Sequence, residues 1–191
     1  MRFNPHYNLS GLHAPFSPSQ PSWLRYNDEK TKEVYLSRKA SEMGTRLHEW
    51  AKTTIDLGIK QPRSKKTIYA YVNDAIGFKM KTEVILYFSV RFFGTADAIC
   101  FRENPETGRY ILRIHDLKTG KTPVHREQVE VYAALFCLEY KVKPSDIDIE
   151  LRIYQYDDVD IWNPTVEDIA PIMDRIVHLN KILEKIDFEE D

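Results

Sequence analysis

Cysteine, glycine and long apolar runs are scarce in this sequence, and each shortage excludes a class of protein. Only two cysteines, Cys100 and Cys137, occur among the 191 residues, and neither belongs to a CxxC pair. This count excludes a disulfide framework and a four-cysteine metal cluster, so we interpret both as reduced thiols of the core. Seven glycines and ten prolines are too few for a fibrous or low-complexity chain.

Membrane and secretion signals are missing as well. No apolar run approaches the roughly 20 residues that a membrane-spanning helix needs. The N-terminal segment, residues 1–10, is polar and lacks the apolar stretch of a signal peptide. We therefore expect no membrane partner and a location in the cytoplasm of the cell that makes or hosts the protein.

The net charge of −2 is far from the strong positive charge of a nucleic-acid coat or histone-like protein. It is compatible with a nuclease, because such an enzyme must hold acidic metal ligands and needs only a local positive groove.

The residue pattern predicts an N-terminal arm followed by one domain. Residues 1–22 are rich in proline, serine and asparagine and are predicted to form an extended arm, with a single domain over 23–191. Apolar residues at helical spacing predict helices over 28–57, 68–79, 124–140 and about 165–186, and Gly58 is expected to end the first helix. Runs rich in Val, Ile, Phe and Tyr predict strands over 83–89, 92–101, 110–118 and 147–156.

This order of elements predicts an α/β fold. The first three strands are most simply an antiparallel meander. The strand–helix–strand unit over 110–156 is expected to form a right-handed parallel crossover. The predicted architecture is therefore a small mixed β-sheet flanked by helices.

Charged side chains stand among apolar neighbours on the second and third predicted strands. Side chains alternate along a strand, so Asp116 and Lys118 share a face and lie roughly 6–7 Å apart. Asp97 is predicted to face one side of the preceding strand, with Gly94 and Ala96 on the other. If these two strands pair, Asp97 and Asp116 lie side by side near one end of the sheet.

Two such carboxylates would repel each other, which would raise the pKa of one of them. A bound Mg²⁺ or Mn²⁺ would relieve this repulsion. Such a cation polarises a phosphoryl oxygen and lowers the pKa of an attacking water, while a lysine orients that water. An Asp-x-Lys alone is more often a surface ion pair. Its position at the end of an apolar strand, beside a second acid, favours a catalytic centre.

Several segments then occur in an order typical of one family. They are Ser17-Pro-Ser19, Gly44-Thr-Arg-Leu-His48-Glu-Trp50, Gly94-Thr-Ala-Asp97, Asp116-Leu-Lys118-Thr-Gly120 and Gln128-Val-Glu-Val-Tyr132-Ala133. Together they resemble the PD-(D/E)XK nuclease superfamily and, within it, the RecB-like exonucleases that include phage and CRISPR-associated members. The resemblance runs from about Ser17 to the closing helix.

The resemblance implies a restriction-endonuclease-like core and a role for each matched position. It assigns metal binding to His48, Asp97, Asp116 and the backbone carbonyl of Leu117. It makes Lys118 the catalytic lysine, with Gln128 and Tyr132 contacting DNA or positioning that lysine. A histidine ligand would favour Mn²⁺ over Mg²⁺. CRISPR-associated relatives often carry four cysteines for an iron–sulfur cluster, which this chain cannot bind.

Some positions have two interpretations. Glu83 is equally well a further metal carboxylate or an exposed acid, and His48 could instead pack on the apolar stripe of its helix. Without the other motifs, Tyr132 would be core and Gln128 solvated. The candidate DNA contacts, each with a plain structural alternative, are Trp23 and Tyr26 for base stacking, the basic cluster Arg63, Lys65 and Lys66, and the basic cluster Lys121, His125 and Arg126.

The expected function is a divalent-metal-dependent DNA nuclease, most simply an exonuclease in phage or recombination-type DNA processing. DNA ends or single strands would be the substrate, in the host cytoplasm if a phage encodes the protein. A recombination or single-strand-annealing protein would be a partner, and the resemblance is compatible with a homo-oligomer. The alternatives are a structure- or site-specific endonuclease on the same fold and a non-catalytic DNA-binding or assembly protein.

Overall fold

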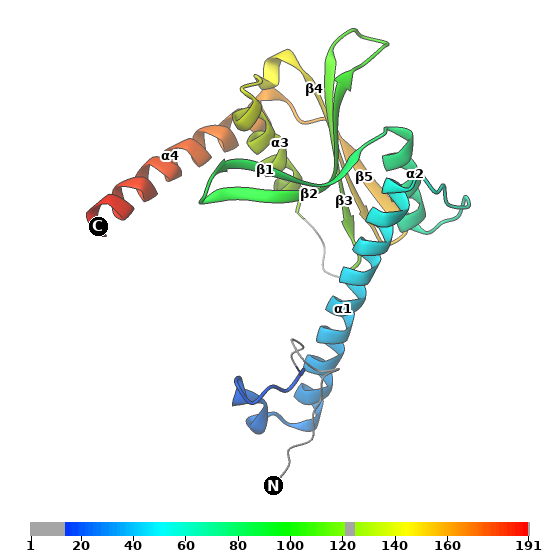
Figure 1. Cartoon of the computed structure of the whole chain (residues 1–191), viewed down its shortest axis with the longest axis vertical. Helices are drawn as coiled ribbons and strands as arrows, with labels where there is room; N and C mark the ends of the chain where they lie inside the picture. Colours follow the sequence, from blue (N-terminus) through cyan, green and yellow to red (C-terminus); the bar gives the residue numbers. More distant parts are fainter. Residues whose placement is uncertain (1–13, 121–124, 191) are drawn as a thin grey trace, which may run out of the picture. The chain divides into compact units, whose positions relative to one another are not determined.

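A computed structural model describes residues 14–120 and 125–190 of the chain, with side-chain surroundings up to residue 187. The elements in chain order are η2 (Pro21–Arg25), α1 (Asp28–Asp56), α2 (Thr67–Gly77), β1 (Lys81–Ser89), β2 (Phe92–Glu103), β3 (Tyr110–Lys118), α3 (Glu127–Tyr140), η3 (Pro144–Asp146), β4 (Asp148–Gln155), β5 (Asp158–Trp162) and α4 (Val166–Glu190) (Figure 1). Two compact units divide the chain, one up to Arg46 and one from Leu47 onward, so the boundary lies within α1.

The first unit contains η2 and the beginning of α1. Most of the predicted arm, residues 1–13, lies outside the described residues, and residues 14–22 consist of turns and the start of η2. The indole N–H of Trp23 donates to the carbonyl of Ser17 at 2.9 Å, and its ring packs against Phe16. Trp23 therefore holds residues 16–23 together through local contacts. Asn27 begins α1 by accepting a 2.8 Å hydrogen bond from the backbone N–H of Lys30, as an N-cap does.

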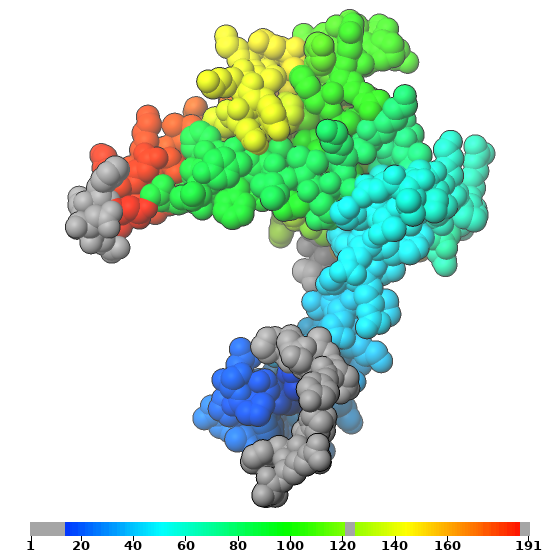
Figure 2. Space-filling model, viewed as in Figure 1, coloured from blue at the N-terminus to red at the C-terminus, as the bar shows by residue number. Residues whose placement is uncertain are grey.

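The second unit is built on one five-stranded mixed sheet in the order β1-β2-β3-β4-β5. Strands β1, β2 and β3 form the predicted antiparallel meander, and β4 pairs with β3 in parallel through α3, also as predicted. Helices flank the sheet, which gives the mixed α/β fold. In the space-filling view, the green surface on the face shown includes β1, β2 and the turn that follows β2 (Figure 2).

Each face of the sheet carries its own hydrophobic core. Leu112, Ile114 and Leu151 pack with α3 and α4 on one face. Leu117 and Tyr154 pack with α2 and the end of α1 on the other face. The neighbouring strands β3 and β4 are therefore covered on both sides, which accounts for their nearly continuous apolar runs.

Element boundaries agree closely with the sequence, with one omission. Strand β3 has the predicted bounds, and Gly58 follows α1 with a φ of 67°, a conformation that glycine adopts without steric cost. The predicted start of α3 at 124 lies outside the described residues. The sequence pattern predicts four strands, and this count was wrong because β5 adds an antiparallel edge strand beside β4. Among the described residues no helix has the length and apolar character needed to cross a bilayer.

Candidate metal centre

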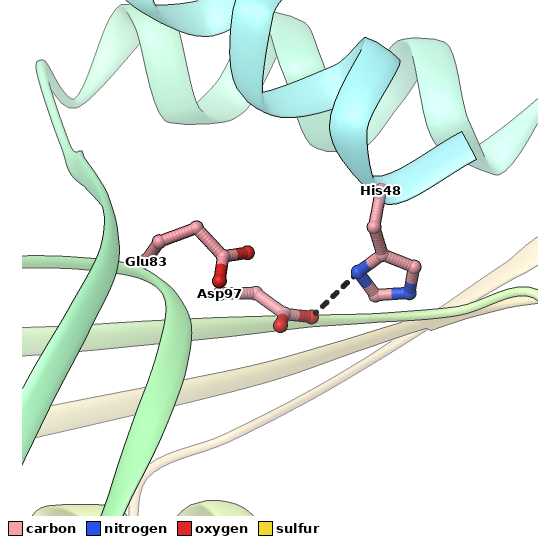
Figure 3. A group of neighbouring side chains, drawn as sticks. All are labelled: His48, Glu83 and Asp97. Atoms are coloured by element: carbon pink, nitrogen blue, oxygen red, sulfur yellow. Dashed lines mark ion pairs between the residues drawn. The ribbon is translucent and has the colours of Figure 1, made fainter. Parts of the chain in front are cut away.

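Three side chains from separate elements of the second unit converge on one point. His48 comes from α1, Glu83 from β1 and Asp97 from β2, and one potential ligand atom of each lies within 4.8 Å of the others. Figure 3 shows His48 reaching from its helix towards Asp97, with Glu83 on the other side of Asp97. The Nδ1 atom of His48 is 3.6 Å from Oδ2 of Asp97. Because ligand atoms stand roughly 2.0–2.6 Å from a bound divalent cation, this spacing suits a shared ion.

The local backbone explains how Glu83 reaches this group. Thr82 pairs with Ala98 and Val84 pairs with Ala96, so Glu83 and Asp97 stand between two paired positions. Glu83 has a φ of 51°, which lies in the left-handed region. A residue with a Cβ atom adopts this backbone conformation at a cost of about 1–2 kcal/mol. Such strain in the middle of a strand is typical of functional positions. Glu83 is exposed and also lies within reach of His48 and Asp97, so both interpretations of Glu83 stay open.

Strand β2 loses its regular alternation at the same place. Ala96 packs in the core with α3, whereas Ala98 packs in the core with α1 and α2. Strict alternation would have put these two alanines on one face. The predicted placement of Gly94 and Ala96 away from Asp97 agrees with the structure, because Ala96 packs with α3 and Gly94 contacts Tyr132 of α3, whereas Asp97 lies near His48 of α1. The irregularity lies at Asp97, opposite the strained Glu83.

A second cluster joins Asp116, Lys118 and Gln128. The ammonium of Lys118 lies 3.0 Å from Oδ2 of Asp116 and donates to Oε1 of Gln128 at 2.8 Å. The amide of Gln128 donates in turn to Oδ1 of Asp116 at 3.3 Å. Asp116 is only 3% exposed, and its Oδ2 accepts no hydrogen bond of acceptable geometry although the lysine is near. This oxygen is ion-paired with the Lys118 ammonium, and a buried carboxylate of this kind favours a neighbouring positive charge.

The two clusters meet at the end of the β2–β3 pairing. Asp97 and Asp116 lie one residue beyond the last paired residues, Ala98 and His115. The backbone N–H of Leu117 donates to Oδ2 of Asp97 at 2.9 Å. The side chain of Leu117 is buried in the α2 core. The N–H of Leu117 thus orients Asp97, while a metal-binding role for its carbonyl stays a prediction.

The buried carboxylates of this region favour the binding of a cation. Burial raises the pKa of Asp97 to about 6, and the charge of Asp116 adds to the rise, whereas the Leu117 N–H, His48 and Lys118 oppose it. Burial also raises the pKa of Asp116 against the opposing effect of Lys118. Tyr71 of α2, which the sequence analysis missed, has a raised pKa because of burial and the nearby charges of Asp97 and Asp116. A divalent cation would offset this concentration of negative charge.

Tyr132 lies beside this region, one helical turn after Gln128. A Cβ atom placed on Gly94 would come within 2.9 Å of Cε1 of Tyr132, so the ring packs directly on the glycine. Burial raises the pKa of the Tyr132 hydroxyl, with smaller contributions from the charges of Asp116 and Asp97. Gln128 and Tyr132 therefore both lie at the predicted position, on the face of α3 that covers the end of β2 and β3.

His115, the neighbour of Asp116, faces the other way and serves the fold. Its Nδ1 lies 3.2 Å from the hydroxyl of Tyr154, which donates to Asp74 at 2.7 Å, and Arg152 also donates to Asp74. Burial holds the pKa of His115 well below its usual value, so the imidazole is neutral. Alternation along β3 therefore separates a structural histidine from a candidate ligand.

The predicted DNA contacts are only partly grouped around the site. Lys66 and Lys118 line the same cleft of about 350 Å³ at the end of β3. Arg126 is instead bound by both carboxylate oxygens of Asp160 and lies over the ring of Trp162. His125 is exposed, and Lys121 lies outside the described residues. Comparisons of the chain with family models, with curated proteins and with solved structures give no match.

Proposed function

We propose that this protein is a divalent-metal-dependent deoxyribonuclease of the PD-(D/E)XK type, with a restriction-endonuclease-like core and a RecB-like exonuclease activity. The observation that carries the proposal is the buried Asp116, whose Oδ2 is ion-paired with the ammonium of Lys118 at 3.0 Å. Two carboxylates can hold a cation for metal-assisted phosphodiester hydrolysis, and a lysine beside them can act in proton transfer.

The chain's own residues divide the work. His48, Glu83 and Asp97 would hold a cation such as Mn²⁺ or Mg²⁺ together with Asp116, and the imidazole favours Mn²⁺. When bound, the cation polarises a phosphoryl oxygen and lowers the pKa of an attacking water. Lys118 is held by Asp116 and Gln128 in a position to orient that water and to stabilise negative charge that develops on the phosphate.

The test is degradation of linear duplex and single-stranded DNA by the purified full chain with Mg²⁺, Mn²⁺ or EDTA. We expect hydrolysis with either metal and none with EDTA. Lys118→Met should lower the rate by a factor of about 100 or more, because a positioned proton-transfer group contributes that much. Asp174→Asn, which changes an exposed carboxyl of α4, should leave the rate unchanged.

Two results would divide the alternatives. Cleavage of closed-circular DNA at a rate similar to that of linear DNA would indicate an endonuclease rather than an exonuclease. Binding of DNA without cleavage in both metals would refute the enzymatic proposal and indicate a DNA-binding or assembly protein.

A further inference from the structure

A second cavity, of about 540 Å³, lies where β1 begins, and its lining includes none of the metal-centre residues. Its floor is apolar and includes Leu86 and Ile99. Three cationic residues, Lys79, Lys81 and Arg102, also line it, and none of its lining residues is acidic. The volume is within the range of about 300–1,000 Å³ typical of ligand-binding pockets.

The cavity exists because β2 is longer than its neighbour. Pairing between the two strands starts at Lys81 and Ile99, while β2 continues to Glu103. Beyond this point no described strand lies beside the outer edge of β2. Arg102 donates from Nη2 to the carbonyl of Lys79 at 2.8 Å, which holds its guanidinium at the rim of the cavity.

The aromatic rings of Phe101, Phe136 and Tyr140 line the same cavity, and Tyr110 extends this run of rings beyond it. Tyr110 stacks on Phe101 with 5.0 Å between ring centroids, Phe101 contacts Phe136 at 5.0 Å, and Phe136 contacts Tyr140 at 4.8 Å. Phe101 is 37% exposed, Tyr110 50% and Tyr140 54%. These rings therefore offer surface to a flat ligand.

We propose that this cavity binds a nucleotide unit of single-stranded nucleic acid, with the base against the aromatic rings and the phosphate near the cations. Aromatic rings next to basic side chains are the usual elements of single-strand binding. An acyl anion would use the apolar floor but only one of the three cations. The uniform positive charge matches a chain of phosphates better.

This binding needs no metal ion, so it goes beyond the proposed hydrolysis. Phe101 follows Asp97 on the same strand at a distance on the order of 13 Å. The cavity would therefore hold the nucleic acid near the metal centre and outside it. The function of this cavity would be to retain a single strand of nucleic acid, which is separate from cleaving it.

The experiment measures binding of a fluorescein-labelled thymidylate octamer to the full chain by fluorescence anisotropy in EDTA. Phe101→Ala should weaken binding about fivefold or more, because it removes a stacking surface. Lys81→Glu, at an exposed position, should also weaken binding and lower the salt slope by about 0.7 for each phosphate that the variant no longer neutralises. Lys185→Glu introduces the same charge change on exposed α4 and should bind as the wild type does.

A second measurement locates the bound base. The octamer carrying 5-iodouracil should crosslink under ultraviolet light to Phe101 or Tyr140. Equal affinities for wild type, Phe101→Ala and Lys81→Glu would overturn the inference, and so would crosslinks confined to other residues. Displacement of the octamer by decanoate or by an acidic peptide at lower concentration than by unlabelled octamer would show that the ligand class is wrong. Because EDTA is present throughout, these outcomes are independent of whether the chain hydrolyses DNA.

Discussion

The backbone N–H of Leu117 donates a 2.9 Å hydrogen bond to Oδ2 of Asp97, so the strand that carries Asp116 and Lys118 orients the carboxylate of the strand beside it. The same oxygen of Asp97 lies 3.6 Å from Nδ1 of His48. One carboxylate oxygen thus connects the β2–β3 pair to α1. Substitutions at Asp97 can therefore separate its structural role from its charge.

Replacing Asp97 tests these two roles. Asp97→Asn keeps an acceptor for the Leu117 N–H and removes the charge, so stability in EDTA should equal or exceed that of the wild type. Asp97→Ala leaves the N–H without a protein acceptor and should cost about 1–3 kcal/mol in the free energy of unfolding. Both variants should lose stabilisation by Mn²⁺. Urea denaturation with EDTA or Mn²⁺ measures both effects, and equal stability of the two variants in EDTA would contradict the hydrogen-bond argument.

The strained backbone at Glu83 predicts opposite changes in stability and metal binding. Glu83→Gly relieves about 1–2 kcal/mol of left-handed backbone strain. The greater flexibility of glycine in the unfolded chain costs about 0.5–1 kcal/mol, so the metal-free protein should still become more stable. Glu83→Ala removes the same carboxylate but keeps the strain. Both should bind Mn²⁺ more weakly than the wild type, as isothermal titration calorimetry can measure. If the glycine variant is no more stable than the alanine variant, position 83 carries no strain.

Acid should affect the metal-free and metal-bound protein in opposite directions. The pKa of Asp97 is about 6 in the folded protein, above its ordinary value of 3.8, so the folded state binds the proton more tightly than the unfolded state. The contribution of Asp97 to metal-free stability is therefore greatest below pH 4 and is lost as the pH rises through about 6. Stabilisation by Mn²⁺ should instead shrink as the pH falls below 6, because the proton competes for the same carboxylate.

Thermal unfolding from pH 4.5 to 8 with EDTA or Mn²⁺ checks this prediction. The useful quantity is the difference between wild type and Asp97→Asn, since other groups titrate in both proteins. A saturating ion at about 100 times its Kd should add about 2.7 kcal/mol at pH 8. A wild-type profile that parallels the Asp97→Asn profile in EDTA would refute the raised pKa.

The contact between Gly94 and Tyr132 predicts a non-additive pair of substitutions. In Gly94→Ala the new methyl group would stand 2.9 Å from the Tyr132 ring, so the ring must move. We expect a loss of about 1–3 kcal/mol in the free energy of unfolding. In a Tyr132→Ala background the same change should cost much less, and urea denaturation of the four proteins gives the coupling. Additive losses would show that the two positions are independent.

Much of this site could be predicted from the sequence, because β3 is regular. Its side chains alternate between two cores, so the spacing of Asp116 and Lys118 was enough to put both on the same face of the strand. The pairing of β2 with β3 followed from the short turn over 104–108. The candidate roles of Gln128 and Tyr132 came from the resemblance and stay predictions, while the structure puts Gln128 in contact with Asp116 and Tyr132 on Gly94.

Other features depend on tertiary context that no local pattern records. Nothing in the residues around Glu83 signals a left-handed backbone, since glycine and asparagine usually occupy such positions. Strand β5 was missed for a similar reason: the turn before it contains Tyr156 with a φ of 56° and has no Asn-Gly or Asp-Gly signal. Whether His48 packs on its helix or binds a metal ion could not be decided from the helix alone, because Asp97 lies near it in space but far from it in the sequence.

The break in side-chain alternation at Glu83 and Asp97 also affects how the packed layers can move relative to each other. Before the break Ala96 of β2 packs with α3, and after it Ile99 packs with α3 while Ala98 and Cys100 pack with α1 and α2, so the metal centre lies where the second packed layer begins. A small sliding of one layer over the other would change the separation of His48 and Asp97 before it disturbed either core. An ion that bridges the two layers would act as a clamp, and its entry should slow amide hydrogen exchange in β1 and β2 more than in β4.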